Sequence, residues 1–122
     1  MTLEELYQSI GADYKQATRV LRVDKLIDKH IRKFAENGVV ERLVAAGRSM
    51  DPTALFESSH AMKGVCANLG LTGLADAASE IAEEFRPGNS RALSDEQVAE
   101  KIETIDKMYE RTIEGIRLYE QS

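Results

Sequence analysis

Hydrophobic residues recur along this chain at intervals of three and four positions, and no stretch alternates with the period of two that a strand requires. Residue types that favour helices, Ala, Leu, Glu, Lys and Arg, dominate the sequence. The apolar seam of the C-terminal segment alternates spacings of four and three: Val98, Ile102, Ile105, Tyr109, Thr112, Ile116 and Tyr119. The pattern therefore predicts an all-α protein.

Two short helices are predicted at the N-terminus. Thr2 and Glu5 have the spacing of a capping box, which opens a first helix that Gly11 ends. Asp13 caps a second piece that runs to about Leu21. Together these helices form a short N-terminal helical arm.

Apolar residues at helical spacing continue through residues 24–48 and predict one long helix there. The pair Asn37-Gly38 interrupts the run, and we interpret it as a kink rather than as a break. The apolar positions are Leu26, Ile27, Ile31, Phe34, Leu43 and Val44.

The next two helices carry clear start signals. Asp51 is an N-cap and Pro52 occupies the first helical position of a helix that runs to about Leu69, with Gly70 as its C-cap. Thr72 caps the helix that follows.

The helix that Thr72 caps runs through Phe85 and stops at the turn sequence of residues 86–89. Ser94 and Gln97 form another capping box and open the last helix. Four substantial helices thus follow the arm, and their short connections make neighbours antiparallel. The predicted fold is an antiparallel up-and-down four-helix bundle. Its core spans about residues 24–119, within a single domain of residues 1–122.

Composition narrows the class of protein. The 16 Lys and Arg against 21 Asp and Glu give a net charge of −5, which argues against nucleic acid or an anionic membrane surface as partner. A single Cys excludes an internal disulfide and Cys-rich metal frameworks. The acidic N-terminus lacks the basic residues of a secretory signal. We therefore expect a cytoplasmic protein that binds no cofactor and no metal.

The candidate chemistry lies on the helix predicted over residues 52–69. At 100° per residue, its core stripe comprises Leu55, Ser59, Met62, Cys66 and Leu69. His60 lies nearly opposite, roughly 170° from the centre of that stripe, and so faces water.

Two neighbours of His60 on the same face strengthen this candidate. Gly64, one turn on, leaves the approach to the imidazole open at a cost of about 1 kcal/mol in helix stability relative to Ala. Lys63 reaches the same face. An accessible imidazole nitrogen beside a cation suits phosphoryl chemistry, because the nitrogen attacks and the ammonium neutralises the oxygens. Two simpler interpretations stay open: a surface histidine without a role, and a glycine that permits close helix packing.

The stretch from Ser59 to Leu71 resembles the histidine phosphotransfer (HPt) family. That family has a His, an apolar residue two positions on, Lys-Gly directly after it, and a small-residue stretch ending in Leu-Gly. The matching positions are His60, Met62, Lys63, Gly64, Asn68, Leu69 and Gly70. The bundle elements also fall where the family has them, so the resemblance covers roughly residues 10–119.

The resemblance implies a phosphorelay intermediate. His60 would accept a phosphoryl group, through Nε2 by analogy, from the phospho-aspartyl residue of a response-regulator receiver domain, and hand it to another receiver. Lys63 would steady the phosphoryl charge. The receiver would supply Mg²⁺ and most of the catalytic groups, so the chain would be a covalent carrier and not an enzyme.

The resemblance also implies a docking surface around His60. We expect it to comprise Phe56, Gly64, Ala67, Asn68 and Leu71. The expected partners are receiver domains, with a hybrid sensor kinase as a further candidate, and the expected state is a monomer.

One position departs from the family pattern. Family members often place a polar residue about 22 positions after the His to hydrogen-bond its ring, and this position is Ala82. Ser79, Glu83 and Arg86 are candidate substitutes. The departure favours an alternative function, a non-phosphorylated HPt-like helical interaction or adaptor module. A third interpretation is a fragment of a larger hybrid sensor, although Met1 and the capped first helix favour a free-standing protein.

The remaining candidates have structural interpretations. His30 lies at the edge of an apolar stripe, so we expect a core-edge histidine with a local partner. Cys66 lies on the core stripe and behaves as a small buried hydrophobe. Tyr109 and Tyr119 follow the seam of the last helix and pack. Three acidic residues are expected on a solvated helix face rather than in a metal site: Glu80, Glu83 and Glu84.

Overall fold

The computed structural model describes all 122 residues. It contains seven α-helices, joined by turns and loops, and no strands. The helices are α1 (Leu3–Ser9), α2 (Tyr14–Leu21), α3 (Asp24–Phe34), α4 (Val39–Ser49), α5 (Pro52–Asn68), α6 (Thr72–Phe85) and α7 (Asp95–Gln121).

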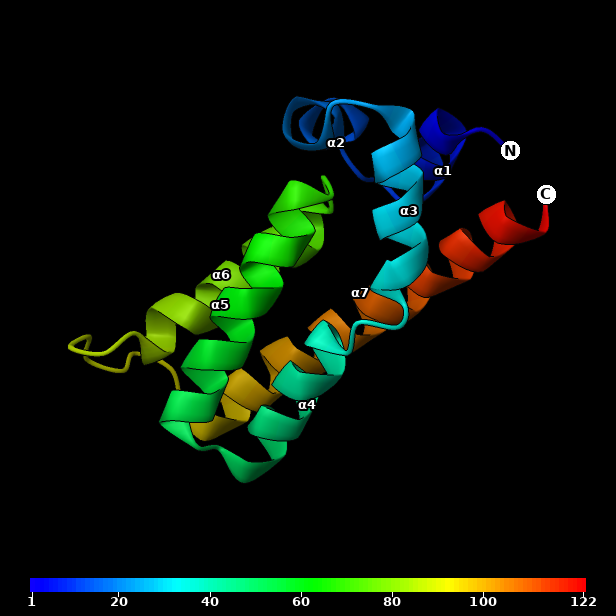
Figure 1. Cartoon of the computed structure of the whole chain (residues 1–122). Helices are drawn as coiled ribbons and strands as arrows, with labels where there is room; N and C mark the ends of the chain where they lie inside the picture. Colours follow the sequence, from blue (N-terminus) through cyan, green and yellow to red (C-terminus); the bar gives the residue numbers. More distant parts are fainter.

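The last four helices form the bundle. Helix α5 packs against α4 and α6, and α7 completes the ring by packing against the same two helices. Figure 1 shows α5 and α6 side by side, with α4 and α7 next to them. The prediction of an all-α four-helix bundle with a short N-terminal helical arm is confirmed.

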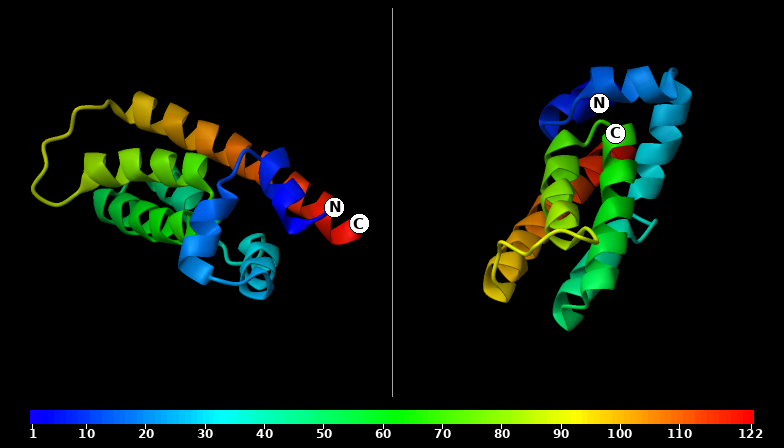
Figure 2. Two further views of the ribbon diagram at one scale, coloured as in Figure 1. Left: turned by 90° about the horizontal axis from the view of Figure 1, so that it is seen from above. Right: turned by 90° about the vertical axis from the view of Figure 1, so that its left-hand side faces the viewer.

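Helix α7 is much longer than its partners. Its 27 residues span about 40 Å at 1.5 Å per residue, so its C-terminal half extends past the bundle. Helices α1 and α3 cover that half. Gly115 makes the contact with α1 possible, because a Cβ there would lie 2.3 Å from Cγ2 of Ile10. This packing brings the two termini close together, as both views of Figure 2 show.

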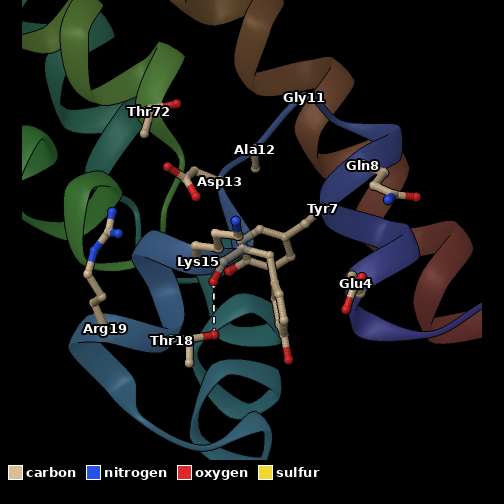
Figure 3. A pocket seen from close by; sticks show the side chains of 11 residues that line it. Glu4, Tyr7, Gln8, Gly11, Ala12, Asp13, Lys15, Thr18, Arg19 and Thr72 are labelled. Atoms are coloured by element: carbon tan, nitrogen blue, oxygen red, sulfur yellow. Dashed lines mark hydrogen bonds between the residues drawn. The ribbon is translucent and has the colours of Figure 1, made fainter.

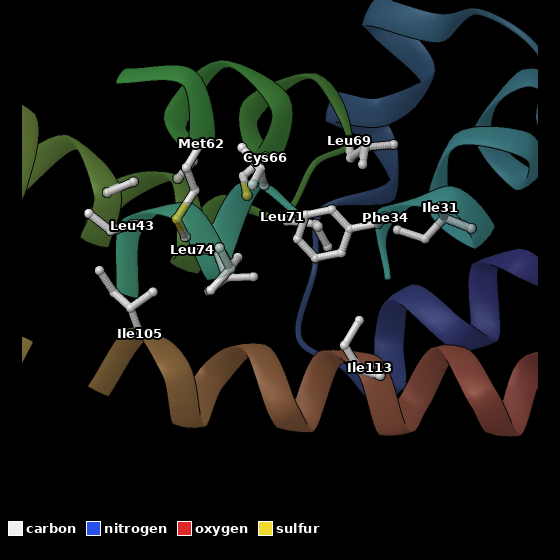
Figure 4. Packing of buried hydrophobic residues seen from close by; sticks show 14 of the residues in the cluster. Ile31, Phe34, Leu43, Met62, Cys66, Leu69, Leu71, Leu74, Ile105 and Ile113 are labelled. Carbon is white, nitrogen blue, oxygen red and sulfur yellow. The ribbon is translucent and has the colours of Figure 1, made fainter. Parts of the chain in front are cut away.

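One hydrophobic cluster of 26 buried residues draws on every helix. Figure 4 shows Met62 and Cys66 of α5 among side chains of α4 and α7, including Leu43 and Ile105. The N-terminal arm belongs to this core, since Leu6 and Tyr7 are fully buried. The Tyr7 hydroxyl donates to the carbonyl oxygen of Leu69 at 2.7 Å, which ties α1 to the end of α5.

The predicted caps are present. Both reciprocal bonds of the Thr2–Glu5 capping box form. Asp51 accepts from the backbone N–H of Ala54, with Pro52 at the start of the helix. The remaining capping side chains are those of Asp13 and Ser94. Thr72 is the first residue of α6 rather than its cap, because Leu71 occupies the N-cap position.

The prediction of one helix over residues 24–48 is wrong, because the chain breaks between α3 and α4. Gly38 adopts φ +72° and leaves the helical path. The side chain of Asn37 accepts the backbone N–H of Val39 at 3.1 Å and so satisfies a donor at the start of α4.

His30 is not a core-edge residue. Helix α3 buries Ile27, Ile31 and Phe34, and its main contacts are with α2 and α7. The side of α3 that carries His30 is open to solvent, so His30 is exposed and its side chain makes no hydrogen bond. Leu26 is also exposed, at 41%. The apolar stripe predicted for this helix is therefore narrower in the structure.

Candidate functional site

Helix α5 carries the candidate site on its outer face. The predicted core stripe is confirmed, since Leu55, Ser59, Met62 and Cys66 are all fully buried. The buried hydroxyl of Ser59 donates to the carbonyl oxygen of Leu55 at 2.6 Å, so the one polar group of the stripe is satisfied. With this face fixed against the core, the opposite face points His60 into solvent.

The imidazole of His60 rests against Phe56, one turn earlier on α5. The two rings are stacked, with centroids 5.6 Å apart and planes inclined by 20°. No side chain or backbone group forms a hydrogen bond with the imidazole, so both of its nitrogens are free. A Cβ placed on Gly64 would meet nothing within 4 Å, so the space on the far side of His60 is open. The site therefore presents an accessible nitrogen nucleophile with one ring face covered.

Lys63 follows His60 by three residues on α5, and its charge acts on Glu83 of α6. The hydrogen bond from Arg86, with attraction to Arg86 and to Lys63, holds the pKa of Glu83 below its usual range. Glu83 also pairs with Arg86. Lys63 makes no ion pair closer than 4 Å, so its ammonium remains available to an anion at His60.

The position expected to orient the imidazole points elsewhere. Ala82 is 1% exposed and packs inside the bundle, so a polar side chain there would enter the core. Of the candidate substitutes, Glu83 and Arg86 bind each other and Ser79 makes no side-chain hydrogen bond. The contact that orients the ring in this structure is the stack with Phe56.

The Leu-Gly end of the motif has a structural role. Gly70 adopts φ +71° directly after α5, and a Cβ there would lie 2.1 Å from the backbone oxygen of Asp13. The carbonyl oxygen of Gly70 accepts the N–H of Asp13 at 2.8 Å. Only glycine satisfies both the dihedral angle and the close approach. The motif thus joins the end of the His60 helix to the start of α2.

The predicted docking residues divide into two groups. Phe56, Ala67 and Asn68 are half-buried or exposed on α5, beside the open space at Gly64. Leu71 is wrongly predicted, because it is 3% exposed and lies in the core. The helical spacing that places Leu71 on the outer face ends with α5 at Asn68, and the left-handed Gly70 turns the chain back toward the interior.

Glu84 also differs from its prediction. It is 8% exposed rather than solvated, and its carboxylate accepts the backbone N–H groups of Ala92 at 3.0 Å and Leu93 at 2.7 Å. Arg91 adds an ion pair at 3.5 Å. Burial alone would raise the pKa of Glu84, but the two N–H groups and Arg91 hold it below its usual range. Glu84 therefore anchors the connection between α6 and α7, a role that helical spacing does not reveal.

Cys66 matches its prediction as a buried hydrophobe. It is a free cysteine with no exposed surface, and burial raises the pKa of its thiol to about 12. Such a thiol stays protonated and is not a nucleophile at neutral pH.

The most prominent cavity lies elsewhere, between α1 and α2 (Figure 3). Glu4, Tyr7, Lys15 and Arg19 line it, and His60 does not. Its buried hydroxyl, that of Tyr7, is already bonded to Leu69. No group of three or more His, Cys, Asp or Glu side chains is placed to hold a metal ion. No helix combines the length and hydropathy needed to cross a bilayer.

Comparison with known proteins identifies the family of the whole chain and assigns no role to single residues. The family model described as the Hpt domain matches residues 2–115, nearly the whole chain. The match includes α1, so the N-terminal arm belongs to the family pattern as well as to the core. A search of curated proteins and a search of solved structures each found no match.

Proposed function

The chain belongs to the Hpt domain family, and from this premise we propose that His60 carries a phosphoryl group between aspartyl residues of receiver domains in a two-component phosphorelay. The observation that carries the proposal is the exposed imidazole of His60, with free nitrogens, facing the open space at Gly64. Hpt domains are phosphocarrier modules, so the chain is a carrier rather than an enzyme that turns over alone.

The proposed step is a reversible transfer between an aspartyl phosphate and the imidazole. The lone pair of Nε2 attacks phosphorus, the phosphorus–oxygen bond to the aspartyl carboxylate breaks, and a phosphorus–nitrogen bond forms. The carboxylate leaves with the electron pair, and the imidazole keeps its proton on Nδ1. The receiver domain brings the Mg²⁺ and the groups that stabilise the leaving carboxylate.

Lys63 is proposed to stabilise the phosphoryl group on His60. Its ammonium lies three residues on along the same helix and is not held in an ion pair of its own. A cation near the equatorial oxygens lowers the energy of both the transfer and the phosphorylated state.

The surface around His60 is proposed as the docking surface for the receiver. It comprises Phe56, Gly64, Ala67 and Asn68, all on α5. Small residues at 64 and 67 let the receiver backbone approach the imidazole closely. We further propose that residues 1–122 form one cytoplasmic domain, that it acts as a monomer, and that a hybrid sensor kinase is a further candidate partner.

An adaptor that binds partners without being phosphorylated is the second candidate function. The observation that favours it is the absence of a hydrogen bond to the His60 ring, together with the buried Ala82. In that case the fold and the exposed surface of α5 would be used without the chemistry.

Phosphotransfer profiling distinguishes the two functions. Each receiver domain of the source organism is charged with phosphate and mixed with wild-type protein or with His60→Gln. The relay predicts an acid-labile, alkali-stable label on the wild type that disappears in the variant, while the thermal midpoint stays within about 2 °C because surface substitutions change stability little. No label from any charged receiver would favour the adaptor.

A further inference from the structure

Charge is strongly segregated along this chain. Residues 14–34, which form α2, α3 and the corner between them, contain seven Lys and Arg against two Asp, a local charge of +5. The rest of the chain holds the remaining nine basic and nineteen acidic residues, a charge of −10. The net charge of −5 therefore conceals one basic element on an acidic protein.

The outer face of α3 carries a row of free cations. Lys25, Lys29 and Lys33 follow one another at four-residue spacing, opposite the buried Ile27 and Ile31, and all three are exposed. None of the three takes part in an ion pair. Arg32, on the edge of the row, is the exception on this helix and pairs with Asp28 and Glu120.

Exposed apolar side chains lie at the same corner. Three of the five large hydrophobic residues that the protein exposes fall within seven positions: Val20 at 40%, Val23 at 53% and Leu26 at 41%. Val20 lies in the last turn of α2, Val23 is the N-cap of α3 and Leu26 lies in the first turn of α3. An apolar centre bordered by charged residues is the usual composition of a protein–protein interface.

The backbone at this corner is constrained. Arg22, between the two helices, has φ +75°, a conformation that costs a non-glycine residue about 1 kcal/mol or more. The chain turns sharply there from α2 into α3. Figure 1 shows this turn at the same end of the molecule as the C-terminal end of α5. Gln16 of α2 donates to the carbonyl oxygen of Ala67 at 3.5 Å, which holds the corner against the His60 helix.

We infer that this basic corner, defined as Val20, Arg22, Val23, Lys25, Leu26, Lys29 and Lys33, docks an acidic protein surface. On the proposed function, on which this inference rests, the occupant is the protein that exchanges phosphoryl groups with His60. The corner binds acidic residues of that partner beside its reacting aspartyl group.

The corner follows α2, and α2 contacts the last turn of α5, the helix that carries His60. Ala67 lies seven residues from His60, about 10 Å at 1.5 Å per residue. A standard interface of about 800 Å² per partner extends farther than that. The corner is thus a specificity-determining surface for the transfer, and the chemistry stays with His60.

The negative charge of the other helices favours a folded protein, rather than nucleic acid or an anionic bilayer, as the partner of the corner. Nucleic acid and anionic bilayers are extended, and they would meet the −10 of the other helices as well as the +5 of the corner. An acidic patch on a folded protein is local and faces only the corner. The exposed Val20, Val23 and Leu26 also match an apolar contact better than a phosphate backbone.

The test compares two triple charge reversals that change the net charge equally. The corner variant is Lys25→Glu, Lys29→Glu, Lys33→Glu, and the control is Lys107→Glu, Arg111→Glu, Arg117→Glu on exposed positions of α7. Transfer from the receiver that labels wild-type His60 is measured at several salt concentrations. At low salt we expect kcat/KM to fall about tenfold or more for the corner variant and less than about threefold for the control, with kcat unchanged in both. The uncharged variant Leu26→Gln should raise KM at every salt concentration.

Phosphoramidate separates docking from chemistry. This small donor phosphorylates imidazole directly, with release of ammonia, and needs no protein docking. The corner variant should react with phosphoramidate at the wild-type rate. Equal effects of the corner and control variants on the receiver reaction would overturn the inference and leave the relay standing. An unlabelled wild type would remove the relay and the inference with it.

Anionic vesicles provide the remaining contrast. Phosphatidylserine vesicles should not sediment the protein. Sedimentation that the corner variant abolishes would overturn the inference in favour of a membrane surface.

Discussion

Phe56 lies stacked on His60, with ring centroids 5.6 Å apart and planes inclined by 20°. The residue predicted from sequence only as part of a docking surface therefore also contacts the proposed phosphoryl acceptor. It covers one face of the imidazole and leaves the ring edges free. With Ala82 buried, this stack takes the place of the polar partner that the family pattern led us to expect.

Replacing Phe56 with Leu tests the importance of the stack. Leu keeps an apolar side chain of similar reach but removes the ring, and an aromatic pair contributes about 0.5–1.5 kcal/mol. We expect transfer from the receiver to slow roughly twofold to tenfold. The side-chain couplings of His60, measured by NMR, should shift toward rotamer averaging. Unchanged couplings would show that the stack does not position the ring.

Replacing each of two glycines near the site by alanine should have opposite effects on the stability of the fold. Gly64→Ala introduces a methyl group into open space within a helix and should stabilise the fold by about 0.5–1 kcal/mol. Gly70→Ala places a Cβ 2.1 Å from the backbone oxygen of Asp13 at φ +71° and should destabilise it by about 2 kcal/mol or more. Urea unfolding measures both. A stable Gly70→Ala protein would show that α2 does not depend on this close approach.

A larger side chain at 64 tests access to His60. Gly64→Gln should block the receiver reaction without unfolding the protein, because the space beside His60 is open to solvent but needed by the partner. Gly64→Ala is the matched control and should transfer more slowly than wild type but measurably. Unimpaired transfer by Gly64→Gln would remove the access argument.

Glu84 should make stability depend on acid pH. Its pKa is lower in the folded protein than the value of about 4.3 expected when unfolded, so its contribution is present above that value and is lost as pH falls through the folded pKa. Glu84→Gln should cost about 1–2 kcal/mol at neutral pH. The difference in thermal midpoint between the two proteins should shrink as pH falls below about 4. A difference that is constant with pH would show that the carboxylate charge does not anchor residues 91–93.

The Cys66 thiol should be unreactive in the native state. Full burial and a pKa raised to about 12 leave almost no thiolate at pH 8. Iodoacetamide should therefore modify Cys66 only in denaturant, as followed by mass spectrometry. Rapid alkylation of the folded protein would show that α5 opens.

The sequence was most informative where local chemistry determines local structure. The capping boxes at Thr2 and Ser94 and the Asp51-Pro52 start depend on contacts within four residues, and all three are present. The exposed position of His60 also followed from spacing, because a core stripe on α5 determines what the opposite face presents.

Features that depend on tertiary contacts were missed. Leu71 is buried because Gly70 redirects the chain, and Glu84 is buried because the connection after α6 folds back over it. The exposure of His30 reflects which helices cover α3, which spacing alone does not specify. The net charge also gave no sign of the basic corner, because a sum over the whole chain does not show where the charges lie.

The most direct test of the central claim is to locate the phosphoryl group. After incubation with a phosphorylated receiver, the protein is analysed by mass spectrometry under alkaline conditions that preserve phosphohistidine. We predict one phosphoryl group per chain, on His60, and none on His60→Gln. A phosphoryl group on any other residue, or an unmodified His60 with every charged receiver, would contradict the account.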